Sequence, residues 1–200
     1  SRPILRRISV RILYIDPAVH SAKSRTYLHY NYLFDQLSQI AECYLYGDEG
    51  LTSILDAVNQ CPQKPDIIYF GMGWFALKEN AFARKLQLDQ VDIPTMGYLF
   101  KPQNFLKEKL DFLKTNQFDE IVTSVPLTSQ YSESTGISCK LLPQASDPTL
   151  FYDRGAEKIY DIGFSGALHD NNIYVDGAFK TVNIRSRLQE ILRSQEGLNT

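Results

Sequence analysis

Apolar residues follow two alternating patterns along most of the chain, and these predict strands and helices in turn. Six short apolar runs predict strands: Val10–Ile15, Cys43–Tyr46, Asp66–Phe70, Ile93–Leu99, Glu120–Thr123 and Ile137–Leu142. Between them, apolar residues recur at helical spacing. This alternation is typical of parallel βαβ units. The sequence therefore predicts an α/β fold, a Rossmann-like parallel sheet with helices on both faces.

The helical spacing places one helix after each of the first five strands. The expected helices cover residues 30–41, 51–58, 77–86, 106–113 and 126–136. In the last of these, Pro126 suits the first helical position, Ser124 is the expected cap, and Gly136 suits the end.

The composition changes near residue 150, which predicts a domain boundary there. Residues 143–158 are polar and aperiodic, as in a linker. A short strand running into a glycine turn follows at Tyr160–Gly166, and helical spacing returns from Ile184 to Leu192. We expect a Rossmann-like domain over residues 1–150. We expect residues 151–200 to hold a linker and the first strand, turn and helix of a truncated second α/β unit, so that the chain is a fragment.

The composition of the chain indicates a globular protein and argues against several classes of binding partner. With 44% apolar residues, the 200-residue chain can bury a core. Its formal charge of −2 gives no general attraction to nucleic acid. The longest apolar stretch, Ile67–Leu77, is too short for a transmembrane segment. Three well-separated cysteines favour reduced thiols and a cytoplasmic location, and no Cys/His cluster predicts a metal site.

Ligands of open α/β sheets bind outside the carboxyl ends of the strands, which singles out the loops that follow them. His20 lies in the first such loop, and its imidazole could take a proton from a hydroxyl. Asp16, four residues earlier at the strand end, could orient that imidazole. The alternative is a surface histidine in a loop.

Later loops supply further candidates for binding a substrate. Gly71 and Gly73 would let backbone approach a ligand, and Trp74 could stack on a sugar ring. A tight turn with Trp74 packed in the core is the alternative. Lys101 could meet a phosphate or carboxylate, or simply begin a helix, and Ser124 ends the fifth strand.

Three motifs along the chain resemble those of GT-B glycosyltransferases, closest to the branch related to spore-maturation CgeB proteins and family 4 glycosyltransferases. The matching stretches are Phe118–Ser124, Leu142–Pro148 with Phe151, and Tyr160–Gly166. In that family the series closes the acceptor domain, crosses the hinge and opens the donor-binding domain. The resemblance implies metal-independent transfer from a nucleotide-sugar donor, without another cofactor, to a sugar or other hydroxyl acceptor. It implies donor contacts by Gly163, Ser165 and Gly166, and it places His20 in a loop where some members carry a catalytic histidine.

The chain also departs from the family's pattern. No Glu is followed by another Glu eight positions on, and the fourth strand ends in Phe100–Lys101 instead of an acidic residue or histidine. Two alternatives to a transferase stay open at this point. One is a non-catalytic sugar- or nucleotide-binding or scaffold domain that has lost the remainder of its donor half. The other is a flavodoxin-like receiver, although Phe70–Gly71 and Thr123–Ser124 stand where it needs an Asp and a Lys.

Overall fold

The computed structural model describes residues 10–21, 28–143, 155, 171–175, 178–182 and 184–195. The chain divides into two compact units, which we describe separately. The first comprises residues 1–101 and 107–144, and the second comprises residues 102–106 and 145–200.

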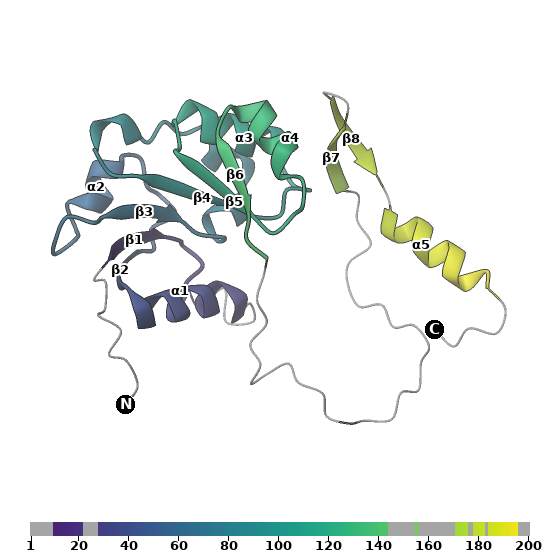
Figure 1. Ribbon diagram of the computed structural model, residues 1–200, viewed down its shortest axis with the longest axis horizontal. Coiled ribbons are helices and arrows are strands. Elements are labelled where there is room, and N and C mark those ends of the chain that lie inside the picture. The colour runs from purple at the N-terminus through teal and green to yellow at the C-terminus, as the bar shows by residue number, and fades with distance from the viewer. Residues whose placement is uncertain are drawn as a thin grey trace, which may run out of the picture. The chain divides into compact units, whose positions relative to one another are not determined.

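The first unit is built on a six-stranded, wholly parallel sheet, which confirms the predicted fold class. Its strands are β1 (Arg11–Ile15), β2 (Glu42–Tyr46), β3 (Ile67–Phe70), β4 (Thr95–Leu99), β5 (Glu120–Thr123) and β6 (Ser138–Leu141). They lie in the order β2-β1-β3-β4-β5-β6 (Figure 1). This extends by one strand the 2-1-3-4-5 order of flavodoxin-like sheets.

Helices cover both sides of this sheet. They are α1 (Leu28–Ile40), α2 (Ile54–Val58), α3 (Leu106–Thr115) and α4 (Thr128–Thr135). Figure 1 shows α1 on one side of the sheet and α3 and α4 on the other. None of the helices in the described part of the chain is long and apolar enough to cross a bilayer.

Two helix predictions were wrong in detail. The helix expected over residues 77–86 is replaced by two short 3-10 turns, η2 (Trp74–Ala76) and η3 (Glu79–Ala83), because the backbone at Leu77 and Lys78 is extended. The last helix of the unit has Leu127 at its cap position, so Ser124 does not cap it. Its end is as expected, since Gly136 has a φ of 77°.

The core on the α3 side is a cluster of aromatic rings, three of which come from the 3-10 segment. The members are Phe70, Trp74, Phe75, Phe82, Phe112 and Phe118. Gly97 of β4 makes room for them, since a β-carbon there would lie 2.8 Å from Leu113 and 3.2 Å from the Phe75 ring. All the rings of the cluster are buried.

The second unit contains an antiparallel hairpin, β7 (Asn171–Val175) and β8 (Ala178–Val182), and the helix α5 (Ile184–Arg193). The helix α5 confirms the helix that the spacing from Ile184 to Leu192 predicted, but the sequence analysis did not predict the hairpin. Its signal was present, because the two residues between the strands are Asp176 and Gly177, a strong hairpin sequence. The predicted strand and glycine turn at residues 160–166 lie outside the described residues.

One buried side chain, Asn116, joins the end of α3 to residues 84–86, which follow the second 3-10 turn. Its Oδ1 accepts from the amide of Leu86 at 2.6 Å, and its Nδ2 donates to the carbonyls of Arg84 and Phe112 at 3.0 Å each. An amide side chain is needed here, because donor and acceptor are both used.

We therefore expect Asn116→Asp to destabilise the first unit by about 2–4 kcal/mol, since an acceptor would then face two buried carbonyls. Urea unfolding measures the change, and Asn80→Asp at an exposed position is the matched control. Equal midpoints for the two variants would show that the Asn116 bonds contribute nothing.

Candidate functional site

The order of the strands places the candidate site at the carboxyl ends of β1 and β3. Strand β1 lies between β2 and β3, so the chain leaves it in one direction and later returns on its other side. This is the switch point at which α/β sheets bind ligands. The loops after β1 and β3 diverge there, and one side chain joins them.

That side chain is Asp16, which is completely buried. Its Oδ1 accepts from the amide of Ala18 at 2.8 Å, and its Oδ2 accepts from the amide of Gly73 at 2.8 Å. Burial raises the pKa of Asp16 to about 6, although the amides of Gly73, Ala18 and Val19 oppose the shift. Asp16 is thus a structural bridge between the β1 and β3 loops.

Glycine is required after β3 because Asp16 comes so close. A β-carbon at Gly73 would overlap Asp16 Oδ1, and one at Gly71 would overlap Asp16 Oδ2 and lie 2.8 Å from the Tyr14 hydroxyl. The φ of Gly73 is −67°, so its backbone conformation alone does not demand glycine. These two predicted binding glycines therefore serve first to admit the carboxylate.

Two buried tyrosines lie beneath the carboxylate. Tyr14 and Tyr69 are paired in register on β1 and β3, their ring centroids 5.1 Å apart. Neither hydroxyl has a hydrogen-bond partner within the described structure. Burial, together with the nearby charge of Asp16, raises the pKa of both phenols. The switch point is therefore poorly solvated, and a charge there depends on its few direct partners.

His20 stands at this edge, exposed and held by one face of α1. Its amide donates to Asn31 Oδ1 at 2.8 Å, and its ring meets the edge of Phe34 at 5.7 Å. Its Nε2 lies 3.6 Å from Asp35 Oδ1. These three α1 residues share a face because they are spaced i, i+3 and i+4.

The carboxylate that the structure places beside the His20 imidazole is that of Asp35, whereas Asp16 was the one expected there. Both oxygens of Asp16 accept hydrogen bonds from backbone amides, whereas an oxygen of Asp35 lies 3.6 Å from the His20 imidazole. Sequence reasoning missed Asp35, because nothing local to residue 35 indicates that the β1 loop folds back onto α1. His20 also has a φ of 54°, a left-handed conformation that is uncommon outside glycine.

Trp74 cannot offer a stacking face. Its side chain is completely buried, in ring contact with Phe70 and Phe112, and the Arg84 guanidinium lies 5.8 Å from the indole centroid. The alternative interpretation, a tight turn with Trp74 packed in the core, is the one that the structure supports.

Lys101 and Ser124 also lie at carboxyl ends of strands. Lys101 follows β4 with a φ of 48°, and its Nζ lies 5.2 Å from the Phe100 centroid. Ser124 follows β5 and is half-buried, and the neighbouring Tyr98 hydroxyl donates to the carbonyl of Leu142 at 3.2 Å. The predicted donor residues Gly163, Ser165 and Gly166 lie outside the described residues.

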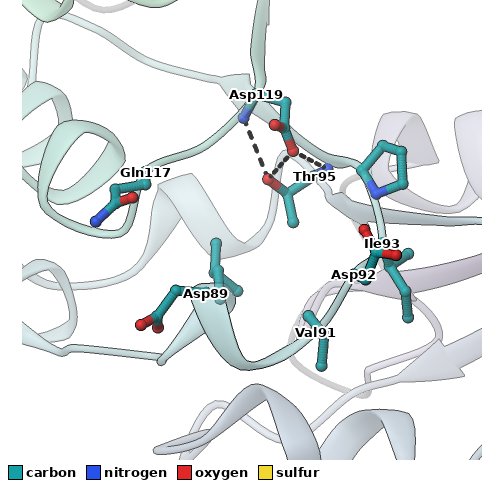
Figure 2. A pocket seen from close by; sticks show the side chains of 9 residues that line it. Asp89, Val91, Asp92, Ile93, Thr95, Gln117 and Asp119 are labelled. Carbon is teal, nitrogen blue, oxygen red and sulfur yellow. Dashed lines mark hydrogen bonds between the residues drawn. The ribbon is translucent and has the colours of Figure 1, made fainter.

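A cavity of about 290 Å³ lies at the opposite, amino-terminal edge of the sheet, beside β4 and β5 (Figure 2). Three aspartates line it, but no group of His, Cys, Asp or Glu in the described residues could hold a metal ion. Asp119 is already engaged, since its Oδ2 accepts from the amide and hydroxyl of Thr95 at 2.7 and 2.9 Å. The carboxyl edge is therefore the better candidate, because α/β ligands bind there.

The burial of Asp16 should make the free energy of unfolding depend on pH. Because the pKa of Asp16 is raised from 3.8 to about 6 in the folded chain, its protonated form favours folding. That contribution, about 3 kcal/mol, is complete below pH 4 and is lost as the pH rises through 6. Urea unfolding between pH 4 and 7 measures the difference in free energy of unfolding between the natural chain and the Asp16→Asn variant. A difference independent of pH would contradict the burial of an ionisable Asp16.

The close approach of Asp16 to the β3 loop can be tested by adding a single methyl group. Gly73→Ala should lower the free energy of unfolding by about 1–3 kcal/mol, because the new β-carbon overlaps the carboxylate. Gly47→Ala is the control, since a β-carbon there meets nothing within 4 Å. If both alanine variants unfold at the same urea concentration, the contact is not as tight as described.

Comparison with known proteins gives no family for the chain. No protein-family model matches it, and neither a curated protein nor a solved structure shows significant similarity. What the carboxyl edge does must therefore be argued from its residues.

Proposed function

We propose that this chain is a glycosyltransferase, or a fragment of one, and that its first unit binds the hydroxyl acceptor at the carboxyl edge of the sheet. The observation that carries the proposal is the exposed imidazole of His20, held beside Asp35 at the switch point. The resemblance of the three sequence motifs supports the choice of reaction, including its independence from a metal ion. The left-handed backbone of His20 also fits a functional role, since such strain is common at active sites.

In the proposed reaction the acceptor oxygen forms a bond to the anomeric carbon of a nucleotide sugar. Its proton passes to His20, and the bond to the diphosphate breaks with the electron pair leaving on the diphosphate. Nε2 faces Asp35, so Nδ1 is the nitrogen left to accept the proton. Asp35 would stabilise the imidazolium that forms, as a carboxylate does in other histidine bases.

Asp16 has a positioning role in this proposal. Its bonds to the amides of Ala18 and Gly73 fix the start of the loop that carries His20. Because those bonds are buried, the loop has little freedom where it leaves the sheet, and a base is effective only when it is held in place.

The proposal predicts that His20→Gln lowers kcat by roughly 10²–10⁴-fold with little change in KM, and that Asp35→Asn lowers it by roughly tenfold or more. Release of nucleoside diphosphate from a panel of nucleotide sugars, with sugar acceptors, is the measurement. His29→Gln and Asp111→Asn control for loss of a histidine and of an exposed carboxylate.

Unchanged turnover in His20→Gln would rule out His20 as the base. Binding of nucleotide sugars without any transfer by the natural protein would contradict the whole proposal and favour a non-catalytic binding or scaffold domain. A receiver is disfavoured despite the strand order, since Phe70–Gly71 lie at the end of β3 where a receiver needs an Asp, and Thr123–Ser124 lie at the end of β5 where it needs a Lys.

A further inference from the structure

The end of β4 is held by a buried lysine that the proposed reaction does not use. Lys109, in the middle of α3, is 1% exposed. Its Nζ donates to the carbonyls of Phe100 and Lys101 at 2.9 Å each and lies 5.6 Å from the Phe82 centroid. Lysine is rarely buried this deeply without a charged partner.

The partners of Lys109 are neutral, which makes its position costly for stability alone. No carboxylate among the described residues lies within ion-pair distance of its Nζ. Burial, and after it the charge of Lys101, lower the pKa of Lys109 to about 7, while Glu108 opposes the shift. Two lysine side chains thus lie close enough at one strand end for their charges to interact, and such pairs of cations occur at binding sites for anions.

Lys109 also determines how Lys101 is presented. The two carbonyls point to its Nζ, so the peptide groups around Lys101 are fixed while its backbone has the left-handed φ of 48°. The Lys101 ammonium lies by the ring of Phe100, and that ring in turn contacts Tyr30 of α1 at 5.9 Å. Helix α1 therefore contacts both the loop of His20 and the end of β4.

We propose that the carboxyl end of β4 binds an oxyanion, either a phosphate or a carboxylate, through the Lys101 ammonium, with Lys109 as the buried positioning residue behind it. A charge-assisted hydrogen bond from Lys101 would hold the anion. The inference goes beyond the proposed transfer reaction, because it holds for any ligand with such a group and does not require His20 to act as a base.

The test is anion binding by the full 200-residue chain, measured by thermal unfolding and calorimetric titration with sodium phosphate and sodium acetate at constant ionic strength in chloride. We expect phosphate or acetate to stabilise the chain beyond chloride, and the stronger of the two identifies the class of anion. Lys101→Gln should weaken that binding roughly tenfold, whereas Lys101→Arg should retain it. Lys114→Gln, at an exposed lysine in the last turn of α3, is the control for loss of charge.

A second measurement separates positioning by Lys109 from a purely structural role. With lysine labelled at Cε with ¹³C, the Lys109 signal should titrate near neutral pH. Its midpoint should rise when the anion binds, because the anion offsets the repulsion from Lys101. This readout needs no Lys109 variant, so it remains valid if Lys109→Met does not fold.

The proposal is overturned if neither anion binds better than chloride, if Lys101→Gln binds as the natural chain does, or if the Lys109 midpoint stays unchanged. Since no turnover is measured, failure here leaves the transfer reaction untouched. Failure of the His20 variants would likewise leave the anion site standing.

Discussion

The bonds between the Asp16 carboxylate and the amides of Gly73 and Ala18 are the constraint on which the candidate site depends. They join two loops that diverge at the switch point of the sheet, and they require glycine at positions 71 and 73. Because the carboxylate is completely buried, the bonds are shielded from water and therefore fix the loops firmly. The position of His20 follows from the other end of the first loop, where α1 holds it.

Two ionisable side chains are buried at the carboxyl edge of the sheet, where their burial lowers the stability of the fold. Asp16 and Lys109 are both buried, and each has a pKa moved toward neutrality by that burial. Among the described residues, neither side chain has an oppositely charged group as its direct partner. Asp16 accepts hydrogen bonds from backbone amides, and Lys109 donates to backbone carbonyls. Perturbed titratable groups of this kind are concentrated at functional sites. The amino-terminal edge differs, because Asp119 and Thr95 satisfy each other there.

Local patterns in the sequence predicted the parallel sheet and its strand positions, because buried strands are short apolar runs. These local patterns gave wrong predictions where contacts between residues far apart in the sequence determine the conformation. The segment 77–86 has helical spacing but lies as 3-10 turns, since Asn116 bonds its end and the aromatic cluster holds its rings. His20 was predicted as a site residue from its place after a strand, whereas Asp35 and Lys109 were not, because only the folded chain brings them to that edge. Trp74 shows the opposite error, since a residue in a candidate loop can point into the core.

The most direct test of the carboxyl edge as the ligand site is amide chemical-shift mapping of the ¹⁵N-labelled chain with a panel of nucleotide sugars and free sugars. We predict that ligands which bind the first unit shift the amides of His20, Gly73, Lys101 and Ser124, at the ends of four different strands. Shifts confined instead to Asp89, Asp92 and Gln117 would place the ligand in the cavity at the amino-terminal edge and contradict this account.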